Sequence, residues 1–326
     1  MLEHGGRLLA AARLYGIPEE DWLDLSTGIN PNGWPVPSFP GDLWLRLPQD
    51  EDGLEEAAKG YYGTSQALPV AGSQSSIHLL PRLRERSRVA ILDPGYSEHA
   101  HAWRKHGHEV VSVPESGILD LAESAQVVVV INPNNPTGKL FSRQELLAAH
   151  GKLAGRGGWL IVDEAFMDAT PDCSLSRDCP LEGLIVLRSV GKFFGLAGAR
   201  VGFVLAEENI LDALKEEMGP WAIAAPSRHA ARLALKDRSW QENARLALQP
   251  RSRSLAQVLE SGGLQVCGGT PLFQWVLCAE APRLFDVLAR QGILVRRFDC
   301  PSGLRFGLPR DDEDLDRLAG ALENLA

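Results

Sequence analysis

The stretch that decides the fold is LIVLRSVGKFFGLAGARVGFVLA, residues 184–206. Its two apolar ends, 184–189 and 199–206, predict buried strands joined by a loop rich in small residues. Lys192 lies in that loop, directly after the first apolar run. A lysine that serves only solubility normally lies on a solvated face among polar residues. The position of Lys192 therefore indicates a chemical role for its amine.

Further strands are expected on the N-terminal side of this stretch. Apolar runs at 88–93, 126–132 and 159–164 alternate with helical patterns such as SRQELLAAHGKLAG at 142–155. Strands made almost wholly of Val, Ile and Leu, interleaved with helices, are typical of a mostly parallel sheet covered on both faces. The sequence therefore predicts an α/β fold.

The pattern changes after Pro226. A long helical stretch covers about 227–261 with a break near Asp237, and short strands with two more helices follow. At about 100–200 residues per domain, a chain of 326 residues is expected to form two domains. We expect a large domain at 41–225 and a small α+β domain at 226–326 that includes the N-terminal segment 1–40. Residues 28–40, rich in Pro and Gly, predict a linker or a loop of the site.

The amino-acid composition excludes several kinds of partner and site. The net charge of −9 argues against nucleic-acid or membrane partners, so an anionic ligand needs a local cluster of arginines or helix N-termini. Five cysteines without a C-x-x-C pair predict reduced thiols and neither a disulfide framework nor a metal site. No signal-peptide pattern and no apolar run of about 20 residues is present, so we expect a soluble cytoplasmic protein.

Chemistry in such a sheet is expected at the carboxyl ends of its strands. Four segments follow the central strands: PGYSEH, PNNPTG, AFMD and VGKFFG. Parallel strands end at the same edge, so we expect Tyr96, Asn135, Asp163 and Lys192 to converge on one rim.

Lys192 and Asp163 together suggest one cofactor. An amine that attacks a carbonyl must be neutral for part of the time, and a carboxylate at the end of an apolar strand needs a cation. Pyridoxal phosphate meets both requirements, because a lysine forms its Schiff base and an Asp keeps its pyridinium nitrogen protonated. A buried Lys–Asp ion pair without a cofactor is the alternative reading of these two residues.

Other residues could hold the same cofactor. AGSQSS at 71–76 precedes a helix, whose N-terminus can receive a phosphate or simply carry a Ser cap. Ser189 and Arg200 flank the lysine and offer a hydroxyl and a guanidinium to that phosphate. Asn135 either bonds the cofactor's 3-hydroxyl or forms the Pro-rich turn, and Tyr96 either stacks on the ring or is a core residue.

The motifs NPNNPTG, DEAF and SVGKFFGLAGARVG, in this order and spacing, resemble the fold-type-I pyridoxal-phosphate enzymes of the class I/II aminotransferase superfamily. They are most similar to its histidinol-phosphate aminotransferase branch. The resemblance covers nearly the whole chain and implies a role for each candidate residue. Lys192 would be the Schiff-base lysine, Asp163 the pyridinium partner, Asn135 the 3-hydroxyl partner and Tyr96 the stacking ring, while Ser73, Gln74, Ser189 and Arg200 would hold the phosphate.

Three further stretches narrow the resemblance: HGG at 4–6, LDLSTGINPNG at 23–33 and MGPWAIAAPSRHAARLALKDRSW at 218–240. They resemble the threonine-phosphate decarboxylase family of cobalamin biosynthesis. The implied reaction converts L-threonine O-3-phosphate into (R)-1-amino-2-propanol O-2-phosphate and carbon dioxide. The resemblance implies that Arg305 holds the substrate carboxylate and that Arg296, His4 and Asn30 receive the substrate phosphate. Lys192 would then return a proton to Cα.

Three positions depart from the pattern of the relatives. Gly191 replaces a Ser or Thr before the lysine, Phe166 replaces a tyrosine that bonds the 3-hydroxyl, and Leu47 replaces a tyrosine offered to the partner subunit's cofactor. The resemblance also implies a homodimer.

Two other functions stay open at this point. A histidinol-phosphate-type aminotransferase would leave pyridoxamine phosphate after a half-reaction. A cofactor-free nucleotide-binding or corrinoid-assembly protein is disfavoured, because the sequence has neither G-x-x-x-x-G-K-[ST] nor a strand-linked G-x-G-x-x-G.

Overall fold

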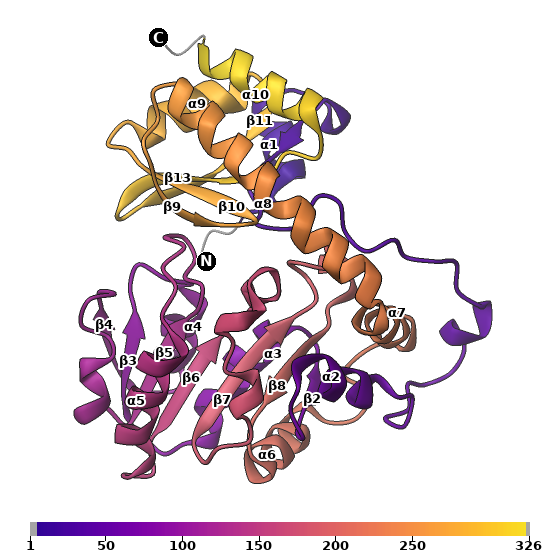
Figure 1. Cartoon of the computed structure of the whole chain (residues 1–326), viewed down its shortest axis with the longest axis vertical. Coiled ribbons are helices and arrows are strands. Elements are labelled where there is room, and N and C mark those ends of the chain that lie inside the picture. Colours follow the sequence, from indigo (N-terminus) through magenta and orange to yellow (C-terminus); the bar gives the residue numbers. More distant parts are fainter. Residues whose placement is uncertain (1–4, 324–326) are drawn as a thin grey trace. The chain divides into compact units, whose positions relative to one another are not determined.

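The structure is a computed structural model that describes residues 5–323. These residues form two compact units, drawn in Figure 1. Unit 1 comprises 5–32, 136–138 and 242–323, and unit 2 comprises 33–135 and 139–241. The functional division expected from the sequence, at 41–225 and 226–326 with 1–40, stays a prediction.

Unit 2 is built on a seven-stranded sheet of order β2-β8-β7-β6-β5-β3-β4 (Figure 1). Neighbouring strands from β4 to β7 are parallel, which confirms the predicted type of sheet. The strands are β2 (Leu68–Val70), β3 (Arg88–Leu92), β4 (Glu109–Val113), β5 (Val127–Ile131), β6 (Trp159–Asp163), β7 (Leu184–Ser189) and β8 (Gly202–Leu205).

One strand of this sheet departs from the parallel pattern. β8 runs antiparallel to both β7 and β2. The chain between β7 and β8 contains the short 3-10 helix η8 (Ala197–Ala199) and no α-helix. A parallel return needs a long crossover connection, so β8 pairs with β7 in the antiparallel direction.

Helices cover both faces of the sheet. On one face, Ile77 of α3, Trp103 of α4 and Leu214 of α6 join a core cluster with alternate residues of the strands. The intervening strand residues, such as Val128 and Val162, are also fully buried, and α5 contacts β6. Unit 2 contains α2 (Leu54–Tyr62), α3 (Ser73–Leu79), α4 (Glu98–Lys105), α5 (Arg143–Ala154), α6 (Glu208–Met218) and α7 (Ala225–Lys236).

Unit 1 contains a four-stranded antiparallel sheet of order β12-β13-β10-β9 and a parallel pair β1-β11. Its strands are β1 (Leu23–Asp24), β9 (Val266–Thr270), β10 (Phe273–Leu277), β11 (Ile293–Leu294), β12 (Arg296–Asp299) and β13 (Ser302–Gly307). Its helices are α1 (Leu8–Tyr15), α8 (Arg238–Ser261, from residue 242), α9 (Ala281–Arg290) and α10 (Asp312–Glu323).

Two local predictions are confirmed by the backbone. Asp237 separates α7 from α8, and its Oδ1 accepts the backbone N–H of Trp240 at 3.0 Å, which satisfies a donor in the first turn of α8. Residues 28–40 contain no helix or strand.

A buried ion-pair cluster joins β7 to the segment that follows β6. Arg188 is 2% exposed, and its guanidinium pairs with Glu164 and with Asp168, both fully buried. The guanidinium also lies 4.7 Å from the centre of the Tyr62 ring. Burial raises the pKa of Glu164, and the charge of Arg188 opposes that rise. The cluster therefore holds the ends of two central strands together only while all its charges are present.

We expect Arg188→Met to lower the free energy of unfolding by about 3–5 kcal/mol, because two buried carboxylates lose their cation. Urea unfolding followed by circular dichroism measures this. Arg290→Met is the control, since Arg290 forms an exposed pair with Asp286 and its loss should leave the midpoint unchanged. Equal midpoints for the two variants would contradict a structural role for the cluster.

Candidate active site

The topology of unit 2 gathers the predicted residues at one edge of the sheet. Asp163 is the last residue of β6 and Ser189 the last of β7. Lys192 follows Ser189 by three residues, and Asn135 and Tyr96 each follow their strand, β5 or β3, by four. These strands are parallel neighbours, so their carboxyl ends meet at the same edge.

Asp163 is held by two hydrogen bonds in the interior. Its side chain is 4% exposed, and its Oδ2 lies 2.9 Å from His99 Nε2. Its Oδ1 accepts the backbone N–H of Ala165 at 3.1 Å. Both carboxylate oxygens are therefore engaged and the orientation of the carboxylate is fixed.

Sequence reasoning missed His99. This residue lies in the first turn of α4, three positions after Tyr96, and is 1% exposed. A histidine at the start of the helix that follows β3 lies near the same rim as Asp163, and this placement was the available signal. The pairing itself needed the structure, because β5 separates β3 from β6 in the sheet.

The loop that carries Lys192 is anchored on aromatic side chains. Phe193 and Phe194 are fully buried, and their rings lie 5.3 Å and 5.6 Å from the Trp240 ring. The carbonyl of Phe194 accepts the N–H of Trp34 at 2.8 Å. Lys192 itself is half-buried, and its Nζ lies 5.3 Å from the centre of the Phe166 ring. The amine is therefore held over an apolar aromatic face at the rim.

Two glycines shape a cradle for an anion. A Cβ on Gly72, whose φ is +73°, would come within 2.8 Å of Arg200 Nη2. A Cβ on Gly202 would come within 2.6 Å of the backbone nitrogen of Ser73. The absence of these side chains lets a guanidinium and the backbone N–H groups at the start of α3 approach one another. This donor set suits a phosphate.

The packing around position 191 explains why it is a glycine. Its N–H donates to Ser189 Oγ at 3.2 Å, and a Cβ there would lie 3.3 Å from both Ser189 Oγ and Ala197 Cα. A larger residue would be crowded between the end of β7 and η8.

Tyr96 couples electrostatically to both parts of this site. Burial raises its pKa, the nearby carboxylates of Glu98 and Asp163 raise it further, and Arg200 lowers it. The Tyr96 hydroxyl donates to Gln74 Oε1 at 2.8 Å. The ring therefore lies within the electrostatic influence of the Asp163 carboxylate and of the arginine in the cradle.

Asn135 is half-buried in the turn after β5. Its neighbour Asn134 donates from Nδ2 to the carbonyl of Pro94 at 2.8 Å. That bond ties the loop that carries Asn135 to the loop that carries Tyr96.

This edge of the sheet fits pyridoxal phosphate, because it brings together a lysine, a carboxylate, an aromatic ring and a cradle for a phosphate.

Three of the four predicted substrate residues, Asn30, Arg296 and Arg305, lie in unit 1. Arg296 of β12 and Arg305 of β13 face each other in the strand register. Arg305 is 6% exposed and donates from Nη2 to the carbonyl of Ser26 at 2.8 Å. Burial and the neighbouring Arg296 lower the pKa of Arg305 to about 10, against the opposing effect of Asp24. Two adjacent guanidinium groups in a buried setting favour binding of an anion.

Asn30 is also buried in unit 1, where its Oδ1 accepts the N–H of Asn32 at 3.0 Å. His4 lies outside the described residues. Within residues 5–323, no cluster of three or more His, Cys, Asp or Glu side chains is arranged to hold a metal ion. All five cysteines are free thiols. Across the same residues, no helix is both long enough and apolar enough to span a membrane.

Comparison with known proteins identifies the family. A family model described as aminotransferase class I and II matches residues 46–322. The threonine-phosphate decarboxylase of Pseudomonas aeruginosa is 52% identical over 322 residues, which cover 99% of this chain and 97% of that protein. The threonine-phosphate decarboxylase of a Sinorhizobium sp. is 43% identical and covers 99% of this chain and 98% of its own length.

The fold is shared with a solved structure, histidinol-phosphate aminotransferase from Sinorhizobium meliloti in complex with pyridoxal-5'-phosphate. Its TM-score is 0.83 at 21% identity, with 100% of this chain and 99% of that chain covered. The family-model match and the two full-length relatives show that this chain belongs to the aminotransferase class I and II family and, within it, to the threonine-phosphate decarboxylases.

Proposed function

We propose that this chain is a pyridoxal-phosphate-dependent decarboxylase of L-threonine O-3-phosphate. It releases carbon dioxide and forms (R)-1-amino-2-propanol O-2-phosphate, the linker precursor in cobalamin biosynthesis. The observation that carries this proposal is the 52% identity over nearly the whole chain to a threonine-phosphate decarboxylase. The rim of unit 2, with its lysine, carboxylate and phosphate cradle, agrees with the chemistry that such an enzyme needs.

The residues of unit 2 bind and orient the cofactor in this proposal. When bound, pyridoxal phosphate supplies an electron-accepting ring that stabilises the charge left at Cα when the carboxylate departs. Asp163, fixed by His99, would hold the ring nitrogen. Lys192 would bind the cofactor's aldehyde carbon and, after carbon dioxide leaves, deliver a proton to Cα.

The remaining contacts position the ring and its phosphate. Tyr96 would stack on the ring, and Asn135 would donate to the 3-hydroxyl. Phe166 has no hydroxyl and offers no second bond to the 3-hydroxyl. The phosphate is held by Ser73, Gln74, Ser189 and Arg200.

The arginines of unit 1 bind the substrate. Arg305 clamps the carboxylate, and Arg296, Asn30 and His4 receive the substrate phosphate. Decarboxylation requires the bond from Cα to the carboxylate to stand perpendicular to the ring, so this clamp acts by orientation. The partner is accordingly a small phosphorylated amino acid, and we expect the enzyme in the cytoplasm, with neither a nucleic-acid nor a membrane partner.

Product analysis tests the proposal. We expect the protein, mixed with pyridoxal phosphate and threonine phosphate, to release one carbon dioxide per aminopropanol phosphate without any keto acid. Lys192→Ala should abolish release, because it removes both the aldehyde-binding amine and the proton donor. No release by the unmodified protein would overturn the proposal. A colourless protein with no visible band to bleach with borohydride would instead indicate the cofactor-free alternative.

The aminotransferase alternative has weaker support. The solved histidinol-phosphate aminotransferase shares the fold at 21% identity, whereas the decarboxylases match at 52% and 43%. In the same assay, conversion of the cofactor to pyridoxamine phosphate instead of carbon dioxide release would favour this alternative.

We expect the role of Arg305 to require a guanidinium group and not only a positive charge. We expect Arg305→Lys to lower kcat/KM at least ~10-fold, because hydrogen bonds to a charged group contribute about 1.5–3 kcal/mol and lysine loses the bidentate geometry. The control is Arg297→Lys. Arg296, which is paired with Arg305 in the strand register, and Arg297 are successive residues of β12, so their side chains point to opposite faces of the sheet. Arg297 pairs instead with Asp299 at 3.1 Å. Equal losses in both variants would argue against a carboxylate clamp.

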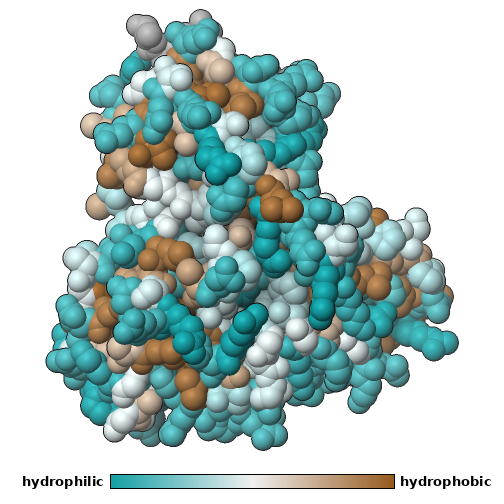
Figure 2. Space-filling model, viewed as in Figure 1, coloured by the Kyte–Doolittle hydropathy of each residue, from teal (hydrophilic) through white to brown (hydrophobic). Residues whose placement is uncertain are grey.

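The apolar surface of unit 2 supports a homodimer. Four large apolar residues of segment 33–50 are more than half exposed: Val36, Trp44, Leu45 and Leu47. Figure 1 draws this segment as an excursion at the right of unit 2, and Figure 2 shows hydrophobic surface on the same part. Large exposed apolar side chains in one segment are typical of an interaction surface, and we propose a second copy of the chain as its occupant.

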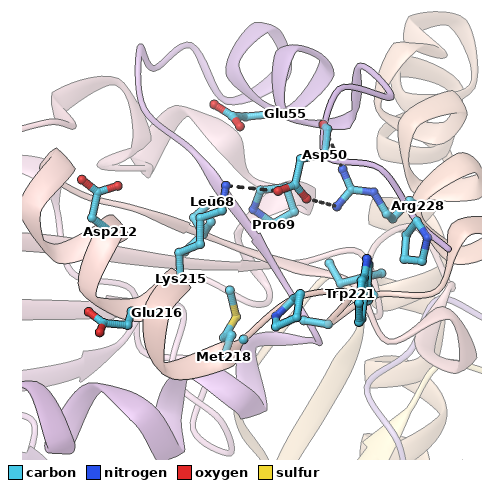
Figure 3. Close-up of a pocket in the computed structure, with 15 residues that line it drawn as sticks. Asp50, Glu55, Leu68, Pro69, Asp212, Lys215, Glu216, Met218, Trp221 and Arg228 are labelled. Carbon is cyan, nitrogen blue, oxygen red and sulfur yellow. Dashed lines mark hydrogen bonds and ion pairs between the residues drawn. The ribbon is translucent and has the colours of Figure 1, made fainter.

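A cavity of about 390 Å³ adjoins this segment and contains none of the predicted cofactor residues. In Figure 3, Lys215 of α6 and Arg228 of α7 point toward Asp50, at 3.1 Å and 3.8 Å. Trp221 lines the same cavity, is more than half exposed and has a φ of +59°. A bulky residue in that strained conformation, left open to water, agrees with an interface that covers it.

Sedimentation tests the dimer. We expect twice the mass of the single chain for the unmodified protein and dissociation for Trp44→Asp, because burying one large apolar side chain contributes about 1.5–3 kcal/mol. Leu246→Asp is the control, since Leu246 is equally exposed but lies on α8 in unit 1. A single-chain mass for the unmodified protein would contradict the proposal.

In such a dimer Leu47 has no hydroxyl to offer to the cofactor phosphate of the partner subunit.

A further inference from the structure

A relay of hydrogen bonds leads away from the candidate active site. The Tyr96 hydroxyl donates to Gln74 Oε1 at 2.8 Å, and Gln74 Nε2 lies 2.9 Å from His78 Nε2. His78 Nε2 in turn lies 3.4 Å from Glu98 Oε2. The four side chains therefore lie in a row of polar contacts, in which His78 Nε2 either accepts from Gln74 or donates to Glu98.

The relay connects the site to solvent. Gln74 and His78 are one turn apart on α3, and Glu98 is the first residue of α4. The His78 side chain is 37% exposed, whereas that of Glu98 is 11% exposed. A proton from solvent can reach His78 without any opening of the fold.

The protonation state of His78 affects which end of the Gln74 amide faces His78 and which end faces Tyr96. In the orientation found, the amide N–H of Gln74 points at His78 Nε2, so that nitrogen accepts. The amide oxygen of Gln74 is then free to accept from Tyr96. Once both nitrogens of His78 carry protons, Nε2 no longer accepts. The amide N–H then has no acceptor on His78, which favours the opposite orientation, with the amide oxygen toward His78 and the NH₂ toward the Tyr96 oxygen.

Several charges surround this histidine. Glu98 Oε2 lies within ion-pair distance of His78 Nε2. Arg82 is paired with Glu217 of α6 at 2.8 Å. Other titratable and charged groups on or next to the elements packed against α3 include Arg82, Glu98, Lys105, His106, His108 and Glu217.

We propose that His78 is a positioning residue that, through Gln74, makes the direction of the Tyr96 hydrogen bond depend on pH. The inference rests on the proposed function, in which Tyr96 stacks on the cofactor. When His78 is neutral, the Tyr96 proton is engaged by Gln74. When His78 is charged, Gln74 donates to the Tyr96 oxygen, and the Tyr96 proton becomes available to an anion bound beside Arg200, which acts on Tyr96.

The first arm of the test uses the protein without cofactor. NMR follows the imidazole nitrogens of His78 and the side-chain amide of Gln74 across about pH 5–8, where histidine titrates. We expect both to change with the same midpoint, and the Gln74 signal to become independent of pH in His78→Gln. A Gln74 amide that does not follow His78 would overturn the inference.

The second arm measures pyridoxal phosphate affinity near pH 6 and pH 8 by tryptophan quenching. Relative to His78→Gln, the unmodified protein should gain about two- to ten-fold in affinity on acidification, the range for one hydrogen bond. His101→Gln is the matched control, because His101 is exposed on α4 outside the relay and should behave as the unmodified protein. Comparison between variants cancels the ionisation of the phosphate itself.

The two arms separate the possible failures. An unmodified protein that binds no pyridoxal phosphate would overturn the proposed function, while the NMR arm would still decide whether His78 reverses the relay. Normal cofactor binding with the same pH dependence in the unmodified protein and in His78→Gln would overturn the inference alone.

Discussion

The ion-pair cluster of Arg188, Glu164 and Asp168 is the constraint on which the site depends. A charged group in the interior of a sheet is tolerated only when its partners are in place. Glu164 directly follows Asp163, and Arg188 directly precedes Ser189. The cluster thus sets the relative position of a carboxylate on one strand and of the loop that carries Lys192 on the next. The ion pairs below the rim therefore act together with the contacts at the rim, where His99 orients Asp163 and aromatic rings anchor the loop of Lys192.

Anion binding by this chain depends on short-range contacts. Its net charge of −9 repels an anionic ligand at long range, so attraction must come from short-range donors. Unit 2 provides these donors around Arg200 and the start of α3, where glycines allow backbone and guanidinium to approach closely. Unit 1 provides Arg296 and Arg305. Burial, and after it the neighbouring Arg296, lower the pKa of Arg305 to about 10, which still leaves its guanidinium charged at neutral pH.

Much of the fold could be read from local pattern. The strands β3, β5, β6 and β7 were predicted within one residue at each end, because continuous Val, Ile and Leu runs are buried on both faces. The direction of β8 was not predicted, since a single apolar run carries no information about its neighbour. His99 and Arg188 were also missed. A histidine in a helix and an arginine in a strand have meaning only when their partners, distant in sequence, are known.

The sequence by itself determined the class of the fold and the order of its motifs, because these depend on spacing along the chain. The tertiary structure decided which side chains meet: His99 with Asp163, Arg188 with two carboxylates, and Tyr96 with His78 through Gln74. Hydrogen bonds and ion pairs act over a few ångströms in space. Residues tens of positions apart come within that range only when the sheet brings their strands and helices together.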